Sequence, residues 1–370
     1  MKILYLTDQT YLHGGIEKVL SQKANYLADV MCYDVTVATY MQHSNTSCYS
    51  FSDKITLIDL GINYDIEKSY FHVINLKKIN KHYAALKRLF KKRKPDIIVS
   101  CNYGPDFFFI PFIDRQIPKI KEFHSTRYFS SQLSGAKNNA MAFLSQYVEK
   151  KYTQLVILNE DELPLYNSSN ITIIPNPAEN DGRRCSLENK RIISAGRISY
   201  QKNFEDLITV GQLIFSEFPD WEIHIYGADY QGRKDVLQNV IEEAGLSNNI
   251  FFMGTSSDLK KTFLRYSIYA MTSNHETFPM VLLEALSVGL PVISYDCPTG
   301  PSRIVVDGAD SFLVPYKNLD KFAEQLKKLM ANQNLRMKMG KNAVENVQRF
   351  SIDKVMTQWN DLFVRFLKEK

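Results

Sequence analysis

The stretch RIISAGRISYQKNF, residues 191–204, decides the fold of this 370-residue chain. It opens with Arg191–Ala195, a short apolar run closed by a glycine, which is typical of a buried strand. A turn follows, and apolar residues at helical spacing begin at Phe204. A strand, a turn and a helix in this order predict one unit of a parallel α/β sheet.

The same alternation extends through the rest of the chain. Downstream of this stretch, the pattern predicts helices at 204–215, 235–244, 259–266 and 279–288, and strands at 222–226, 250–253, 269–272 and 291–294. Upstream, it predicts strands at 3–6, 35–40, 97–100 and 155–158 and a helix at 17–30. A last helix is expected over 352–367. The alternation favours parallel, doubly wound sheets.

The alternation restarts once, after Pro175-Asn176-Pro177 and the polar stretch 179–184. A chain of this length is also longer than one typical core. We therefore predict an N-terminal Rossmann-like domain over 1–178 and a C-terminal one over 188–350, facing a central cleft. A C-terminal helix over 351–370 is free to pack back on the N-terminal domain. Ligands of such sheets bind at the carboxyl ends of the strands.

Composition narrows the class of protein. Hydrophobic residues make up 45% and charged residues 23%, and the formal net charge is +5. The five cysteines are an odd number without a CxxC pair, which predicts reduced thiols and not a disulfide framework or zinc site. The opening residues predict a strand and not a signal peptide. We expect a cytoplasmic protein without nucleic-acid partners.

The first candidate site is the turn His13-Gly14-Gly15-Ile16-Glu17-Lys18, between the first strand and the first helix. Gly14 and Gly15 allow close approach of the backbone, and a helix N-terminus attracts phosphate. The alternative is an ordinary tight turn. The pattern is not GxGxxG, which disfavours a dehydrogenase.

The second candidate site follows the strand Arg191–Ala195. Arg197 and Lys202 are expected at its carboxyl end, where they can neutralise a diphosphate leaving group. The alternative is a pair of solvated surface cations.

The third candidate site is HETFPMVLLEAL, residues 275–286. Glu276 precedes a predicted helix that starts at Pro279, and Glu284 lies inside it. A carboxylate at a helix N-terminus stays ionised and accepts hydrogen bonds from sugar hydroxyls. The backbone N–H groups of Thr277, Phe278 and Met280 are candidates to contact the same ligand. The alternative for Glu276 is a solvent-exposed acid before an amphipathic helix.

The two glutamates, seven residues apart, resemble the E-x7-E motif of the retaining GT-B glycosyltransferases of family 4. The glycine pair, a central histidine and the Arg197/Lys202 pair extend the resemblance over nearly the whole chain, as does the linker Ile174-Pro175-Asn176-Pro177. The resemblance implies a GT-B fold. It also implies that Arg197 and Lys202 bind the donor diphosphate.

The resemblance implies further roles. Glu276 is expected to contact the transferred sugar, Glu284 the nucleotide ribose, and Gly14-Gly15 the donor phosphate and the reacting centre. His124, within EFHSTR at 122–127, matches the active-site histidine. Two residues depart from the usual pattern: Ser125 replaces an acid after the histidine, and Thr277 replaces a glycine. The segment 296–302, DCPTGPS, is similar to one in bacterial envelope-polysaccharide enzymes.

Neither a metal nor a cofactor is expected. No Asp-x-Asp occurs, and the seven histidines show no paired ligand spacing. Arg197, Lys202 and a helix dipole are expected to stabilise the departing diphosphate in place of Mg²⁺.

The resemblance implies a retaining, metal-independent hexosyltransferase. The expected donor is a nucleotide sugar carrying hexose or N-acetylhexosamine, with UDP preferred and GDP-mannose as the alternative. The expected acceptor is a glycan or lipid-linked molecule in cell-envelope polysaccharide synthesis, such as lipopolysaccharide or capsule. Two alternatives are a sugar-nucleotide epimerase on the same fold and a non-catalytic nucleotide-sugar binding module.

The segment 77–94 mixes apolar helical positions with dense cations. One interpretation is peripheral contact with the inner face of a membrane. The other is a solvated helix face with Leu86, Leu89 and Phe90 turned to the core. Nucleic-acid binding is disfavoured because no basic stripe occurs elsewhere.

Overall fold

The protein is described here by a computed structural model that covers residues 1–370 except 71, 129–134 and 369–370. The chain forms two compact units, one of residues 1–177 with 352–370 and the other of residues 178–351. The second unit starts ten residues before the predicted 188, because residues 178–187 pack onto it. Cys185 N donates to Val288 O at 2.9 Å, and Leu187 O accepts from the buried Arg336.

The described residues of the first unit form a seven-stranded sheet in the order β3-β2-β1-β4-β5-β6-β7. Every neighbouring pair is parallel. The strands are β1 (Lys2–Thr7), β2 (Asp34–Thr39), β3 (Thr56–Asp59), β4 (Ile97–Ser100), β5 (Lys119–Glu122), β6 (Gln154–Ile157) and β7 (Ile171–Ile173). All carboxyl ends therefore meet at one edge of the sheet.

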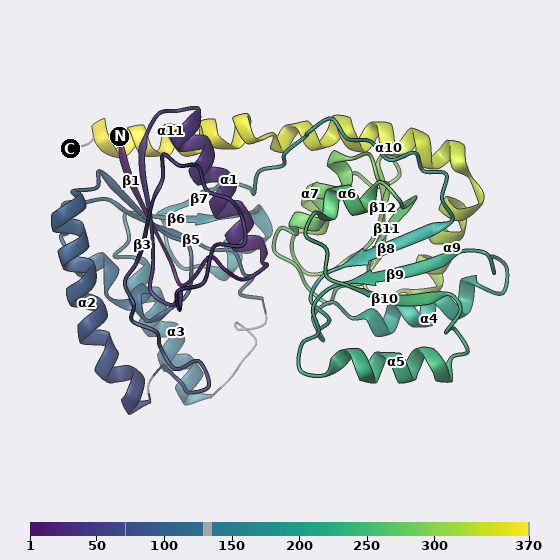
Figure 1. Ribbon diagram of the computed structural model, residues 1–370, viewed down its shortest axis with the longest axis horizontal. Helices are drawn as coiled ribbons and strands as arrows, with labels where there is room; N and C mark the ends of the chain where they lie inside the picture. Colours follow the sequence, from purple (N-terminus) through teal and green to yellow (C-terminus); the bar gives the residue numbers. More distant parts are fainter. Residues whose placement is uncertain (71, 129–134, 369–370) are drawn as a thin grey trace. The chain divides into compact units, whose positions relative to one another are not determined.

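Helices cover both faces of this sheet (Figure 1). Those described in the first unit are α1 (Gly15–Asp29), α2 (Val73–Arg93), α3 (Ala136–Glu149) and α11 (Ile352–Lys368), with short 3-10 turns η1 (Pro105–Phe108), η2 (Ile110–Phe112) and η4 (Glu160–Leu165). The helices α1 and α11 pack side by side on one face, where Trp359 of α11 is buried. The helix α2 packs on the opposite face through Leu86, Leu89 and Phe90.

The second unit contains a six-stranded parallel sheet in the order β10-β9-β8-β11-β12-β13. The strands are β8 (Arg191–Ala195), β9 (Glu222–Tyr226), β10 (Ile250–Gly254), β11 (Ile268–Met271), β12 (Val292–Asp296) and β13 (Ser311–Pro315). The helices are α4 (Phe204–Ile214), α5 (Arg233–Glu243), α6 (Leu259–Phe263), α7 (Met280–Ser287), α8 (Pro301–Ile304), α9 (Leu319–Ala331) and α10 (Gln333–Val347), followed by the 3-10 turn η5 (Gln348–Phe350). Both units thus have a Rossmann-like sheet, as predicted.

Two local differences from the sequence prediction concern the elements that carry candidate site residues. The helix expected to start at Pro279 starts at Met280, because Pro279 has an extended ψ of 114° and caps the helix from outside. The strand β5, which no pattern predicted, carries Lys119, Lys121 and Glu122, all buried. Buried parallel strands are normally apolar, so a strand with three charged residues is not predicted from its sequence pattern.

The basic segment forms most of α2, with its apolar positions turned to the core and most of its cations exposed. This packing agrees with the solvated-helix interpretation and leaves the outward cations available. Within the described part of the chain, no helix is long and apolar enough to cross a membrane.

Candidate active site

In the second unit, two loops at the carboxyl edge of the sheet are tied together by hydrogen bonds. They follow the neighbouring strands β8 and β11 and carry residues 196–203 and 272–279. Asn274 Nδ2 donates to Tyr200 O at 2.7 Å, and Gln201 Nε2 donates to His275 O at 3.1 Å. The two sequence motifs that contain Lys202 and Glu276 are therefore one structural site.

Lys202 and Glu276 form an ion pair inside this site. The Lys202 Nζ lies 2.6 Å from Glu276 Oε1, and the side chains are 16% and 8% exposed. Gly196, with φ +156°, leaves room for the lysine, since a Cβ there would come within 2.6 Å of Lys202 Cε. Any residue larger than glycine at position 196 would therefore collide with the Lys202 side chain. A Lys–Glu pair at a carboxyl edge can offer one charge to an anion and the other to hydroxyl groups.

The loop after β12 holds the backbone of Glu276. Glu276 N donates to Pro298 O at 3.3 Å, and Thr299 Oγ1 donates to Glu276 O at 2.5 Å. Gly300 has φ +97° and passes so close that a Cβ would lie 2.5 Å from Thr277 O. The segment 296–302, singled out in the sequence, therefore positions Glu276.

The other predicted residues of the second unit take different positions. Arg197 is exposed, and its guanidinium lies 5.3 Å from the Tyr230 ring centroid. Phe278 turns its ring toward Phe350, with 5.2 Å between the ring centroids. Thr277 and Met280 are buried at the start of α7.

Glu284 lies on α7 and is buried, so it is not a solvent-facing residue of an amphipathic helix. Burial raises the pKa of Tyr269, and the charges of Glu276 and Glu284 raise it further. Tyr269 donates its hydroxyl to Ala195 O, at the end of β8. Both motif glutamates thus surround one tyrosine beneath the site.

In the first unit, the predicted phosphate turn already holds an anion. Gly14 caps α1 in an extended conformation, and Gly15 is the first helical residue. The carboxylate of Glu17 lies against Gly14, where a Cβ would be 2.3 Å from Glu17 Oε2. Gln9 Nε2 donates to Glu17, and burial raises the pKa of this carboxyl group. The helix N-terminus is therefore partly neutralised by Glu17, which stands within the predicted turn but was given no role in the prediction.

His124 follows β5 at the same edge of the first sheet. Its Nε2 lies 3.4 Å from Glu122 Oε1, and its side chain is only 5% exposed. Lys23 Nζ lies 2.6 Å from both oxygens of Glu122. The sequence analysis missed Glu122 and Lys23. Alternation along the chain would have placed Glu122 on the face of His124, but nothing local indicated Lys23.

Three side chains of the kinds that bind metal ions, one of them His124, lie close together in the first unit. Suitable atoms of Cys101, Glu122 and His124 lie within 4.8 Å of one another, although no spacing in the sequence indicated this group. The Lys23 ammonium already neutralises Glu122, and burial raises the pKa of the Cys101 thiol. These two features disfavour the thiolate and the open carboxylate that zinc requires.

The predicted site residues therefore fall into two groups. Each group lies at the carboxyl edge of its own sheet: Gly14, Gly15 and His124 in the first unit, and Arg197, Lys202, Glu276, Thr277, Phe278, Met280 and Glu284 in the second.

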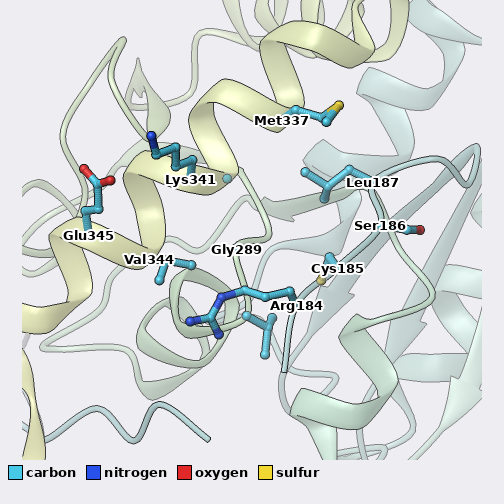
Figure 2. Close-up of a pocket in the computed structure, with 11 residues that line it drawn as sticks. Arg184, Cys185, Ser186, Leu187, Gly289, Met337, Lys341, Val344 and Glu345 are labelled. Carbon is cyan, nitrogen blue, oxygen red and sulfur yellow. The ribbon is translucent and has the colours of Figure 1, made fainter. Parts of the chain in front are cut away.

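Two surface cavities lie away from these residues. One cavity, of about 320 Å³, is lined by residues 184–187, by Gly289 and by side chains of α10 (Figure 2). Its Cys185 has a pKa raised to about 12 by burial, so the thiol is not a nucleophile at neutral pH. A second cavity, of about 900 Å³, lies beside the C-terminal part of α2 and is lined by Lys87, Lys91 and Lys94.

Comparison with known proteins agrees with the architecture. Residues 177–346 match the family model of glycosyl transferases group 1. The chain is 25% identical over 94% of its length to an uncharacterized glycosyltransferase of Haemophilus influenzae, of which it covers 96%. It is also 25% identical over 98% of its length to the amylovoran biosynthesis glycosyltransferase AmsD of Erwinia amylovora, of which it covers 99%.

A solved structure shows the same fold. A variant of S. aureus TarM, in complex with Fondaparinux, alpha-GlcNAc-glycerol and UDP, superposes with a TM-score of 0.81 at 16% identity. The match covers 98% of this chain and 99% of that one. Two Rossmann-like units in one chain are the architecture of the GT-B fold. The match of residues 177–346 to glycosyl transferases group 1, together with these full-length relatives, identifies the chain as a glycosyltransferase.

Proposed function

We propose that this protein is a retaining, metal-independent hexosyltransferase. It moves a hexose or N-acetylhexosamine from a nucleotide sugar to a glycan or lipid-linked acceptor. The observation that carries the proposal is the Lys202–Glu276 ion pair at 2.6 Å, held in loops that three hydrogen bonds tie to one another. A pair of opposite charges suits a donor that has both a diphosphate and a sugar.

The proposed donor binds to the second unit. Its diphosphate takes the charges of Lys202 and Arg197, and sugar hydroxyls donate to Glu276. Glu284 accepts from the ribose. Lys202 is paired with Glu276 before the donor arrives. When the donor binds, the Lys202 ammonium turns partly from the Glu276 carboxylate to the donor phosphate.

The proposed reaction needs no nucleophile from the enzyme. The acceptor hydroxyl forms a bond to the anomeric carbon on the face from which the diphosphate leaves. The bond between that carbon and the phosphate oxygen breaks, its electron pair stays with the diphosphate, and the hydroxyl proton passes to the departing phosphate. Lys202, Arg197 and the N-terminus of α7 stabilise the developing charge, so the proposal requires no Mg²⁺.

Relatives support the choice of substrates. The TarM structure contains UDP, and AmsD is named for amylovoran biosynthesis. We assign this chain a UDP-sugar, with GDP-mannose as the alternative, and an acceptor in envelope polysaccharide synthesis. The first unit, with His124, is assigned to the acceptor.

Thermal unfolding with a panel of nucleotide sugars tests the donor assignment. A donor at 100 times its Kd should stabilise the protein by about 2.7 kcal/mol. We expect one or two donors to raise the melting temperature equally with and without EDTA, and Glu276→Ala to reduce the rise. A rise that EDTA abolishes contradicts the metal-independent mechanism.

Product analysis separates the two alternative functions. Transfer releases free UDP and a glycan whose new linkage has the anomeric configuration of the donor. An epimerised nucleotide sugar without free UDP would instead identify an epimerase. Donor binding without turnover on any glycan or lipid-linked acceptor would identify a binding module.

We also assign a peripheral membrane contact to α2. Its outward cations Lys87, Lys91 and Lys94 line the cavity of about 900 Å³ beside apolar Phe90 and Ile117. Such a surface suits the phosphate of an anionic lipid and a short length of its apolar part.

Vesicle sedimentation tests this contact. We expect vesicles of an anionic phospholipid to retain the wild type and to release a variant with Lys91, Lys92 and Lys94 changed to Glu. The matched control changes Lys321, Lys327 and Lys328 of α9 to Glu, with the same change in net charge. Retention of the α2 variant would refute the contact.

A further inference from the structure

A buried pair of charges lies directly behind His124 in the first unit. Lys23 reaches from the middle of α1 to Glu122, the last residue of β5, and its Nζ lies 2.6 Å from both carboxylate oxygens. The lysine is 1% exposed and the glutamate 2%. Removing two ions from water opposes folding unless their geometry is good and their remaining contacts are satisfied.

Aromatic rings complete the surroundings of the ammonium. Lys23 Nζ lies 3.7 Å from the centroid of Trp359 and 5.6 Å from that of Tyr5. Both rings offer negative π faces to the cation. Trp359 belongs to α11, so the last helix of the chain closes the ion pair from solvent.

The carboxylate of Glu122 connects this pair to His124. Burial opposes its ionisation, but the charges of Lys23 and His124 hold the pKa of Glu122 well below its ordinary value. The ionised carboxylate lies 3.4 Å from His124 Nε2 and accepts from Cys101 Sγ at 3.6 Å. A carboxylate on one imidazole nitrogen fixes the ring orientation and the tautomer, leaving Nδ1 for the substrate side.

We infer that Lys23 and Glu122 are positioning residues for glycosyl transfer. The ammonium fixes the carboxylate, and the carboxylate fixes the imidazole of His124. This inference rests on the proposed function, in which His124 acts on the acceptor side. Neither residue reaches the substrate, because both are sealed beneath α11 and the sheet.

The lysine takes the place that a metal ion would need. Cys101, Glu122 and His124 offer three ligand atoms within 4.8 Å, but the Lys23 ammonium already occupies the carboxylate side of that group. Glu17, on the same helix as Lys23, is another carboxylate whose charge interacts with His124. An internal ammonium therefore supplies the charge, and the wild type should be indifferent to EDTA and to added zinc.

Two double variants test the inference without leaving an unpaired buried charge. Lys23→Met with Glu122→Gln keeps a neutral acceptor near His124, whereas Lys23→Met with Glu122→Met removes it. Both are compared with wild type and His124→Ala for melting temperature, and for kcat and donor KM in the transfer assay. If the two double variants have equal melting temperatures, a difference in kcat between them does not come from a difference in folding stability.

We expect kcat of the Met/Met variant to fall by about 10–100-fold with an unchanged donor KM, since a misplaced catalytic group costs this much. The Met/Gln variant should recover most of the loss. Wild-type kcat in Met/Met, with His124→Ala inactive, would overturn the positioning role alone. Wild-type kcat in His124→Ala would overturn the assignment of His124 and this inference with it. Loss of wild-type activity in EDTA would show a metal centre in place of the ammonium.

Discussion

Each unit contains one lysine–glutamate pair at the carboxyl edge of its sheet, and the two pairs have the same length. Lys23–Glu122 and Lys202–Glu276 both measure 2.6 Å from nitrogen to oxygen. They differ in exposure. The first is 1% and 2% exposed, whereas the second is 16% and 8% exposed.

This difference in exposure separates two uses of the same chemistry. A sealed pair cannot exchange partners with a ligand, so it can only fix the groups around it. A partly open pair can give its lysine to an incoming phosphate and its glutamate to a sugar hydroxyl. Desolvation also makes the sealed pair far more sensitive to loss of one partner.

The largest effect is expected from breaking the sealed pair on one side. Lys23→Ala leaves the Glu122 carboxylate buried without its partner, and we expect it to lower the free energy of unfolding by about 3–5 kcal/mol. Denaturant titration measures this. The control is Lys54→Ala, whose pair with Asp29 is exposed to solvent and should contribute little to stability. Similar losses in both variants would remove the contrast between sealed and open pairs.

Breaking the open pair should instead affect turnover. Glu276→Ala removes the charged acceptor for the sugar, and we expect kcat to fall by about 10²–10³-fold. Transfer of label from the donor sugar to the acceptor measures it. Glu324→Ala, on the exposed face of α9, is the control and should behave as wild type. Unchanged turnover in Glu276→Ala would refute the donor placement.

The buried carboxylate of Asp106 sharpens the contrast through pH. Burial raises the pKa of Asp106 from 3.8 to about 6, against the opposing charge of Lys121. Between these values the folded protein holds a proton that the unfolded chain releases, so stability falls as pH rises from about 4 to about 6. The fall should approach about 3 kcal/mol, from 1.36 kcal/mol for each pKa unit.

Unfolding of Asp106→Asn measured from pH 4 to 7 checks this expectation. The variant should lack the loss of stability that wild type shows with rising pH, while the exposed-residue control Asp320→Asn should keep it. Identical pH profiles for Asp106→Asn and wild type would contradict the raised pKa.

The smallest of the four effects is expected for Lys202→Ala. The donor loses one charge-assisted hydrogen bond worth about 1.5–3 kcal/mol, so kcat/KM should fall by roughly 10–100-fold. We expect donor affinity and kcat to fall together, because the charge serves the bound donor and the departing diphosphate. Initial rates over a range of donor concentrations measure both. Lys190→Ala, which breaks an exposed pair with Asp220, is the control.

Local pattern was sufficient for most of the fold. The apolar run Arg191–Ala195 and the helix after Phe204 are strand and helix in the structure, because short-range periodicity reports which face is buried. The same reasoning did not predict β5, because Lys119, Lys121 and Glu122 interrupt the apolar run that marks a buried strand. Charges inside a sheet are stable only with partners from elsewhere in the chain, and a local window does not contain them.

The site divides in the same way. The sequence by itself predicted that Arg197, Lys202 and Glu276 lie near a carboxyl edge, because they stand in short stretches after strands. The donor-binding role proposed for them and for Glu284 comes from the resemblance to family 4. Only the tertiary structure decided what lies behind His124. Lys23 and Glu122 are 99 positions apart, and Trp359 comes from the last helix. Their contact depends on the packing of α1 and α11 onto one sheet. In the low dielectric of that interior, each charge of the pair needs the other to remain stable.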